Sequence, residues 1–312
     1  MKSVVITGAT GFIGKALSKK LLREGLTVYG VDLDIKKLEE LSEWGDFIPI
    51  VAEFRQYPSL HEQIHSRNID VFYHLAWQSV TGNEFLDYEV QLQNAKFVCD
   101  AVWEAIKMKC PKFVYAQTSN YFEIRDYVNG DICEPRYSYV YSAAKTVAEI
   151  IAKTIAHNEG IEFCSGSVCR VYGEDNPNAM QDMPYIIIKK LLEGIQPSLV
   201  DKRIPYDMIY IADVTEAFYA IGKFGIDKKT YYIGSRVIKT IGEWFSGIRD
   251  IVNPDIELLY GAYKDAKQFD YSSIDLDALY NDTGFECQDD YAESILKTSE
   301  WIKNYINECE DQ

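Results

Sequence analysis

Long apolar segments are missing from this sequence. No run approaches the roughly 20 consecutive apolar residues that a membrane-spanning helix needs. The chain starts with residues 1–6, which lead directly into a strand-like segment and lack the regions of a signal peptide. We therefore expect no membrane partner and a cytoplasmic protein.

Disulfide and metal-binding patterns are also missing. The seven cysteines include no C-x-x-C pair, and the four histidines fall in no known metal-binding motif. His61 and His65 are four residues apart, but no further ligand follows at a known spacing. We expect reduced cysteines, as in a reducing compartment, and no metal site.

Basic residues are scarce relative to acidic ones. The 32 Lys and Arg against 48 Asp and Glu give a formal net charge of −16 at pH 7. Such a surface repels nucleic acid, so we expect no nucleic-acid partner. A phosphorylated small molecule stays open as a ligand, because a few local Arg, Lys and backbone N–H groups can reverse the field inside one cleft.

What the chain does contain is an alternation of strand-like and helix-like segments. Apolar runs suited to buried strands cover residues 3–7, 27–31, 47–51, 71–75, 112–116 and 162–168. Helical patterns lie between them at residues 13–24, 59–66, 85–108 and 142–157. This alternation predicts an α/β fold with a Rossmann-like, doubly wound parallel sheet.

Three glycines follow the first strand-like segment and open the first helical one. Gly8 permits a tight turn, Gly11 lets the backbone approach a pyrophosphate, and Gly14 allows close packing of helix on strand. The positive N-terminus of this helix favours phosphates, and we expect Phe12 and Ile13, which stand there, to contact the cofactor. Glycine spacing alone is a weak signal, but the strand before it and the helix after it are typical of dinucleotide binding.

The second strand-like segment ends in a carboxylate. Asp32 stands 18 residues after Gly14, and an acid about 20 residues beyond such glycines accepts hydrogen bonds from the adenosine ribose. Leu33 and Asp34 follow, so no arginine stands there to pair with a 2′-phosphate. The sequence predicts NAD as the cofactor rather than NADP.

The segment pattern changes near Asp175, where turn residues and prolines become frequent. The tail mixes short strands at residues 230–233 and 256–259 with helices at residues 241–251 and 290–306. We predict an NAD-binding Rossmann domain at residues 1–173, to which residues 205–235 return. Residues 174–312 would form mainly a smaller C-terminal α/β cap that binds substrate over the strand ends.

Tyr141 and Lys145 stand four residues apart, on one face of a predicted helix. The spacing alone means little, since the chain has 23 tyrosines and Lys also follows four residues after Tyr at four other places. Tyr141 is singled out by its position after the strand-like segment at residues 112–116, which leads to the hydroxyl groups of Thr118 and Ser119.

Taken together, these motifs resemble the extended short-chain dehydrogenase/reductases, in particular the NAD-dependent nucleotide-sugar epimerase/dehydratase family. The matching pieces run through most of the chain: residues 7–14, Asp32, His74-Leu75-Ala76, Thr118, Tyr141 with Lys145, Val171-Tyr172-Gly173 and residues 207–214.

The resemblance implies a catalytic set. Tyr141 would act as acid and base on a sugar hydroxyl or ketone, and Lys145 would lower the pKa of its phenol and hold the nicotinamide ribose. Thr118 would donate a hydrogen bond to the reacting oxygen, with Ser119 as the alternative.

The resemblance also implies further cofactor contacts. Glu53 and Phe54 fall where the family contacts adenine, and Leu75, Ala76 and Trp77 fall where it lines the cofactor. Ordinary packing at strand ends is the alternative for both groups.

The chain departs from the family on the substrate side. The family's 4,6-dehydratases carry Asp-Glu after the catalytic Thr, whereas Ser119 and Asn120 stand here, so we expect no dehydration and place both residues beside the substrate. Tyr206 stands where the family usually has an Arg, and Arg170 where it often has Asn. Arg170 and Arg203 are therefore our candidates for binding a diphosphate, with pairing of Arg170 to Glu174 as the alternative.

We expect an NAD-dependent enzyme that transfers hydride at a sugar carbon of a nucleotide sugar, as a 4-epimerase or 4-ketoreductase. One alternative is a related enzyme for an alcohol or ketone without a nucleotide. A second is a non-catalytic NAD-binding sensor or scaffold. The resemblance also implies a homodimer formed through the helices at residues 85–108 and 142–157.

Overall fold

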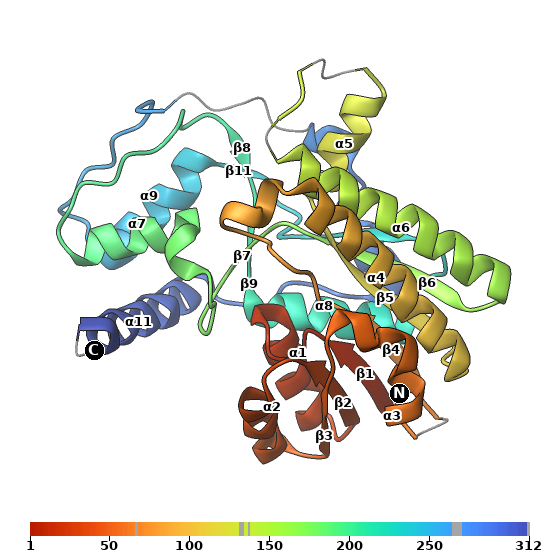
Figure 1. Ribbon diagram of the computed structural model, residues 1–312. Helices are drawn as coiled ribbons and strands as arrows, with labels where there is room; N and C mark the ends of the chain where they lie inside the picture. Colours follow the sequence, from red (N-terminus) through yellow and green to blue (C-terminus); the bar gives the residue numbers. More distant parts are fainter. Residues whose placement is uncertain (66–67, 131–133, 137, 264–269, 311–312) are drawn as a thin grey trace. The chain divides into compact units, whose positions relative to one another are not determined.

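Seven parallel strands form the main sheet of the computed structural model, which describes residues 1–65, 68–130, 134–136, 138–263 and 270–310. In spatial order the strands are β10 (Thr230–Ile233), β6 (Glu162–Val168), β5 (Lys112–Thr118), β4 (Val71–His74), β1 (Ser3–Thr7), β2 (Thr27–Asp32) and β3 (Phe47–Val51). The chain runs outward from β1 to β3 and then returns to β4 on the other side of β1 (Figure 1). Open sheets of this kind bind ligands at that reversal, outside the carboxyl ends of the strands. The predicted Rossmann-like parallel sheet is confirmed.

The chain divides into two compact units. The first comprises Met1–Val168, Thr215–Ile233 and Ile274–Phe285, and the second comprises Cys169–Val214, Gly234–Ser273 and Glu286–Gln312. The boundaries differ from the division that we predicted, at residues 1–173 with 205–235 and at residues 174–312. That division concerns which part binds cofactor and which binds substrate, and it stays a prediction.

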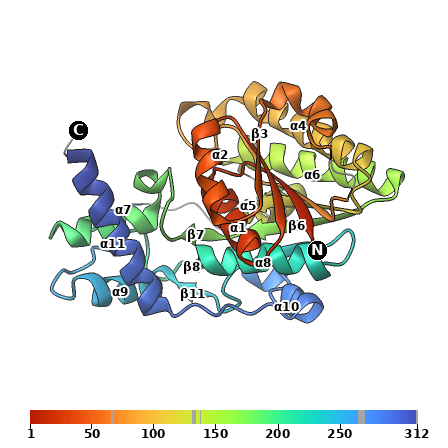
Figure 2. The same cartoon turned by 90° about the horizontal axis from the view of Figure 1, so that it is seen from below.

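Helices cover both faces of the sheet in the first unit (Figure 2). On one face, α4 (Tyr88–Lys107) and α6 (Tyr139–Glu159) pack on each other and on the sheet. Side chains such as Phe72 and Phe113 meet small residues of these two helices in a buried core. On the other face, α8 (Ile211–Phe224) brings Gly222 against Tyr73. Because both faces are covered, strands such as β5 and β6 are buried along nearly their whole length.

The remaining helical elements of this unit include a twelve-residue helix that packs on β1 and β2, together with several shorter ones. They are α1 (Phe12–Arg23), α2 (Ile35–Leu41), η1 (Ser42–Trp44), η2 (Phe54–Ser59), α3 (Leu60–Gln63), η3 (Asn83–Leu86), α5 (Asn120–Val128) and α10 (Ala278–Thr283). An ion pair between Lys20 and Glu216 joins α1 to α8 on the face opposite α4 and α6.

The second unit combines two small sheets with three packed helices. In one sheet, β7 (Arg170–Tyr172) pairs in parallel with β9 (Met208–Tyr210). In the other, β8 (Pro205–Tyr206) pairs antiparallel with β11 (Lys239–Thr240). The helical elements of this unit are η4 (Ala179–Gln181), α7 (Met183–Leu192), α9 (Ile241–Val252), η5 (Tyr271–Ser273) and α11 (Tyr291–Glu310), of which α7, α9 and α11 pack on one another. Tyr172 shares a hydrogen bond with Ser294, 2.9 Å between the hydroxyl oxygens, which ties β7 to α11.

Some predicted elements differ from the observed ones. The strand predicted at residues 256–259 is wrong, because only Leu259 forms a bridge, to Ser198. The helix predicted at residues 85–108 is divided at Asp87, whose carboxylate accepts hydrogen bonds from the N–H groups of Glu89 and Val90 and so starts α4 anew. The helix predicted at residues 59–66 is shorter in the structure: α3 covers Leu60–Gln63, Ser59 ends η2, and residues 64 and 65 are not helical. Residue 66 lies outside the described residues.

None of the described helices is long and apolar enough to cross a membrane.

Replacement of Gly222 by Ala tests the packing of α8 on the sheet. A Cβ at this position would lie 1.8 Å from the Tyr73 hydroxyl oxygen and 2.7 Å from the adjacent ring carbon. Alanine normally favours a helix over glycine by about 1 kcal/mol, but overpacking costs about 1–3 kcal/mol. We expect Gly222→Ala to lower the urea midpoint, and Tyr73→Phe in the same chain to restore part of the loss. A Gly222→Ala protein that is more stable than the parent would contradict this packing.

Candidate active site

The turn between β1 and α1 requires glycine at two positions. Gly8 has a φ of 73°, and a Cβ there would lie 2.8 Å from the backbone nitrogen of Ala76. A Cβ on Gly14 would lie 1.9 Å from the Gly8 carbonyl oxygen, so α1 begins directly against the turn. The Gly11 N–H donates to the same carbonyl oxygen at 3.1 Å. The three glycines thus form one tight, backbone-lined turn.

The first turn of α1 exposes backbone donors at this place. Gly11 precedes the helix, and Phe12 and Ile13 begin it; none of the described side chains caps this end, and its first turn holds no acid. N–H groups in a first helical turn lack intrahelical acceptors, and the helix dipole adds partial positive charge. This glycine cradle fits the pyrophosphate of a dinucleotide.

Asp32 stands at the end of β2 with its carboxylate against the turn. One carboxylate oxygen accepts a hydrogen bond from the Thr10 N–H at 2.9 Å, and the other from the Leu33 N–H at 2.8 Å. Each carboxylate oxygen can accept a further bond, so both remain available to ribose hydroxyls. Asp34, by contrast, caps α2 by accepting from the N–H groups of Lys36 and Lys37.

The segment after β4 lies beside the same turn. The Leu75 N–H donates to the Thr7 carbonyl oxygen at 3.2 Å, and the Ala76 backbone closes on Gly8. Trp77 donates its indole N–H to the Gln91 side chain at 2.8 Å. Leu75 and Ala76 thus meet the glycine turn or the strand end next to it, whereas Trp77 binds α4.

Glu53 and Phe54 begin η2, beyond β3. The Glu53 N–H donates to the Gln56 side chain at 2.7 Å, and the Phe54 ring stacks on Phe97 of α4, with centroids 4.7 Å apart. Phe54 therefore packs against the core of the sheet, as the packing alternative expected. Contact of either residue with adenine stays a prediction.

Thr118 is the last residue of β5. Its Oγ1 accepts a hydrogen bond from the Asn120 N–H at 3.3 Å, which leaves its own hydroxyl hydrogen to donate. Ser119 donates its N–H to the Val168 carbonyl oxygen, and Asn120 begins α5. These three half-buried residues therefore connect the end of β5 to the start of α5, and the Ser119 backbone is held by β6.

Tyr141 and Lys145 lie one turn apart near the start of α6. The half-buried Tyr141 ring lies edge-on to Trp77, with centroids 6.0 Å apart, and beside Phe85. The Lys145 ammonium lies 4.4 Å from the centroid of the Trp77 ring and 5.9 Å from that of Tyr141. Its Nζ donates to the Ala116 carbonyl oxygen at 2.7 Å. Tyr141, Lys145 and Trp77 therefore form one cluster beside the end of β5.

Burial sets the charge state of Lys145. The side chain is almost completely buried, and this burial lowers its pKa to about 7. An amine that titrates near neutral pH can change its charge, and thereby its effect on a neighbouring phenol, under ordinary conditions.

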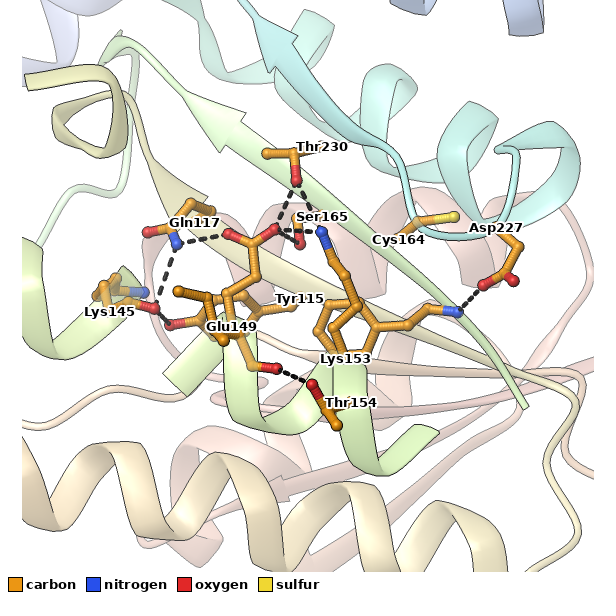
Figure 3. Close-up of polar contacts among 12 residues, drawn as sticks. Tyr115, Gln117, Lys145, Glu149, Lys153, Thr154, Cys164, Ser165, Asp227 and Thr230 are labelled. Atoms are coloured by element: carbon orange, nitrogen blue, oxygen red, sulfur yellow. Dashed lines mark hydrogen bonds and ion pairs between the residues drawn. The ribbon is translucent and has the colours of Figure 1, made fainter. Parts of the chain in front are cut away.

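The sequence did not predict the side-chain contacts of His74 or the cluster around Glu149. His74 is buried and lies 2.9 Å through Nδ1 from the Thr7 hydroxyl oxygen, and burial lowers its pKa to about 3, so the ring is neutral. Behind Lys145, the buried carboxylate of Glu149 binds several side chains (Figure 3). The spacing Lys145, Glu149, Lys153 on a helix that must cover the sheet is the signal that could have revealed this cluster.

Arg170 and Arg203 belong to the second unit and both form ion pairs there. The Arg170 guanidinium lies 2.9 Å from the Asp182 carboxylate rather than pairing with Glu174, whose carboxylate instead accepts the Tyr210 hydroxyl at 2.8 Å. Tyr206 and Asp182 raise the pKa of Arg170, which indicates that Tyr206, at the usual place of the family's Arg, is its neighbour.

Arg203 is largely exposed and binds Asp201, with Nε 3.0 Å from one carboxylate oxygen. The two residues are two positions apart in the sequence, so their ion pair stabilises the turn that precedes β8.

Comparison with known proteins identifies the broader group to which these features belong. The sequence model described as the NAD dependent epimerase/dehydratase family matches residues 4–234. The dTDP-4-dehydro-6-deoxyglucose reductase of Escherichia coli is 24% identical over 245 residues, which cover 74% of this chain and 76% of the reductase.

Solved structures share the fold over nearly the whole chain. The UDP-glucose 4-epimerase of Thermotoga maritima, solved with UDP-glucose, aligns with a TM-score of 0.76 at 19% identity, covering 97% of this chain and 99% of that one. The UDP-glucuronic acid 4-epimerase of Bacillus cereus, solved with NAD, aligns with a TM-score of 0.77 at 19% identity, covering 98% of each chain. At this identity the likeness is one of fold.

The position of Asp32 generates a prediction about cofactor choice. Its carboxylate should accept bonds from the ribose hydroxyls and repel a 2′-phosphate, so NAD should bind about tenfold or more tightly than NADP, the effect of one charge-assisted hydrogen bond. Asp32→Ala should narrow this difference mainly by weakening NAD. The measurement is fluorescence titration with NADH and NADPH, and equal affinities in the unmutated protein would refute the role of Asp32. Asp46→Asn is the matched control, because Asp46 binds Thr27 at the opposite end of β2.

Proposed function

The chain belongs to the NAD dependent epimerase/dehydratase family, and from that membership we propose that it uses NAD to transfer hydride at a sugar carbon of a nucleotide sugar. The observation that carries the proposal is the cluster of Tyr141, Lys145 and Trp77 beside the end of β5. The same unit holds the glycine turn and Asp32. A phenol, a buried amine and a dinucleotide cradle are the parts that such a reaction needs.

In this proposal each residue has one task. Bound NAD would supply the hydride acceptor or donor. Tyr141 takes a proton from, or returns it to, the oxygen on the reacting carbon, and the charge of Lys145 favours the phenolate form of Tyr141. The Thr118 hydroxyl donates a hydrogen bond to the same oxygen. Lys145 also holds the nicotinamide ribose, and the N-terminus of α1 holds the pyrophosphate.

The residues after Thr118 limit the type of reaction. Ser119 and Asn120 stand where the family's 4,6-dehydratases carry an acid and a base, and neither side chain can act as a carboxylic acid. These two positions therefore lack the acid and base that the 4,6-dehydratases use to eliminate water, which favours a 4-epimerase or a 4-ketoreductase.

The pairing of the two arginines supports a second candidate. Asp182 and Asp201 already offset the charges of Arg170 and Arg203. An oxidoreductase whose alcohol or ketone substrate carries no diphosphate would need neither arginine for binding. The two ion pairs therefore favour a substrate without a diphosphate. Binding of free nucleotides separates the two candidates.

A homodimer is also part of the proposal. Helices α4 and α6 pack side by side and expose apolar side chains: Leu92, Trp103, Val147, Ile150 and Ile151. An exposed apolar patch of this kind favours association with a second copy, as the family resemblance implies.

Replacement of Tyr141 tests catalysis. We expect Tyr141→Phe to lower turnover by about 100-fold or more, the usual contribution of a general acid–base, with NAD affinity nearly unchanged. Lys145→Ala should reduce both turnover and NAD affinity. The measurement is absorbance of NADH with a panel of UDP-, dTDP- and CDP-linked keto-sugars. Tyr139→Phe, two residues earlier on the same helix, is the matched control and should keep full activity. Near-full activity of Tyr141→Phe would remove Tyr141 from the mechanism.

Replacement of Arg170 tests the substrate class. Free UDP, CDP or dTDP at millimolar concentration should raise the melting temperature, and Arg170→Ala should weaken that binding by about tenfold or more, as loss of a charge-assisted hydrogen bond does. Asp182→Asn should strengthen binding, because it frees the guanidinium while Asn still caps α7.

The thermal response to NAD is the internal control. If NAD stabilises the protein and no nucleoside diphosphate does, the nucleotide-sugar assignment fails, and an alcohol or ketone without a nucleotide becomes the substrate class to test.

A further inference from the structure

Glu149 is a buried carboxylate one helical turn after Lys145. Its side chain is almost fully enclosed. One carboxylate oxygen accepts a hydrogen bond from the Gln117 side chain at 2.8 Å. The other accepts from the Ser165 hydroxyl at 2.8 Å, from the Lys153 ammonium at 2.9 Å and from the Thr230 hydroxyl. Figure 3 shows these groups converging on the carboxylate from α6, β5, β6 and β10.

The same cluster holds the helical turn that carries Lys145. The Gln117 side-chain nitrogen that binds Glu149 also donates to the Lys145 carbonyl oxygen at 3.2 Å. The Tyr115 hydroxyl donates to this carbonyl oxygen at 3.4 Å. Two side chains of β5 thus fix the backbone of α6 at Lys145, and one of them is oriented by Glu149.

The Glu149 carboxylate affects the charge state of Lys145. Burial opposes the charged form of Lys145, and the negative charge of Glu149 favours it. Other titratable groups face Lys145 from the neighbouring elements: Tyr141 on α6, Tyr115 on β5 and His74 on β4. Burial raises the pKa of Tyr115 well above its usual value and keeps His74 uncharged, so neither offsets the ammonium.

Glu149 itself is ionised. Burial alone would raise its pKa, but Lys153 and the hydrogen bonds from Gln117 and Thr230 outweigh burial and lower it. The carboxylate therefore carries a full negative charge at neutral pH. A charge held this deep is felt strongly, because the surrounding dielectric is low.

We propose that Glu149 is a positioning residue for the reaction proposed above, which holds Lys145 in its charged form and, through Gln117, in its place beside Tyr141. The competing explanation is a purely structural one, in which Glu149 only ties α6 to β6 and β10 through Ser165 and Thr230. The two explanations make different predictions: the protonation of Lys145 depends on Glu149 in the first and is independent of it in the second.

The test is a pH titration of the Lys145 side chain by NMR, in protein labelled with carbon-13 lysine and free of NAD and substrate. Lys145→Arg identifies the signal by its loss. In Glu149→Gln, which keeps the size of the side chain, the pKa of Lys145 should fall by about one unit or more. The double variant Glu149→Gln with Lys153→Met removes both charges of this ion pair and leaves no cation without its carboxylate, and in it the pKa of Lys145 should fall as well. Glu162→Gln is the matched control, because the half-exposed Glu162 pairs with Lys112 instead, and it should leave the titration unchanged.

An unchanged Lys145 titration in folded Glu149→Gln would overturn the proposal and leave Glu149 a structural role. If Glu149→Gln alone does not fold, the double variant decides: a fall in the pKa of Lys145 supports the proposal, and an unchanged pKa overturns it. Because neither measurement uses cofactor or substrate, this result is independent of the nucleotide tests that decide the proposed function.

Discussion

The buried ammonium of Lys145 is the constraint on which the candidate site depends. A charge taken out of water is costly unless dipoles and opposite charge replace its hydration. Here the Ala116 carbonyl, the face of Trp77 and the carboxylate of Glu149 do so, and they come from β5, from the segment after β4 and from α6. These three elements must therefore keep their relative positions, and the same arrangement brings Tyr141 to the carboxyl ends of the strands.

Much of the first unit follows from the sequence. The predicted strands at residues 3–7, 47–51, 162–168 and 230–233 match the observed ones, because short strand-like runs alternate there with turn and helix patterns. Residues 256–259 are apolar enough for a strand but find only a single bridge. Helix α8 was not predicted, although its buried side chains Val214, Phe218 and Ile221 recur at the spacing of one helical face.

The site was predictable where its residues follow one another along the chain. The spacing of Gly8, Gly14 and Asp32 along the chain is enough to predict their positions, because a single strand, turn and helix connect them. Partners from distant segments were not predictable: Arg170 pairs with Asp182, because the Glu174 carboxylate is already bound by Tyr210 from β9. Such pairings depend on how the chain folds back, which no local pattern encodes.

Helix α6 reverses the usual arrangement of polar and apolar faces. Lys145, Glu149 and Lys153 turn toward the sheet, small alanines such as Ala148 and Ala152 fill the space between them, and apolar side chains such as Ile150 face outward. A common design rule places charged residues on the outward face of a surface helix. If the outward apolar residues of α6 were replaced by charged ones under this rule, the helix would carry charged residues on both faces. The alanines, with Tyr139 and Ile155, would still pack inward. The exchange would, however, remove the exposed apolar side chains that this helix offers to a partner.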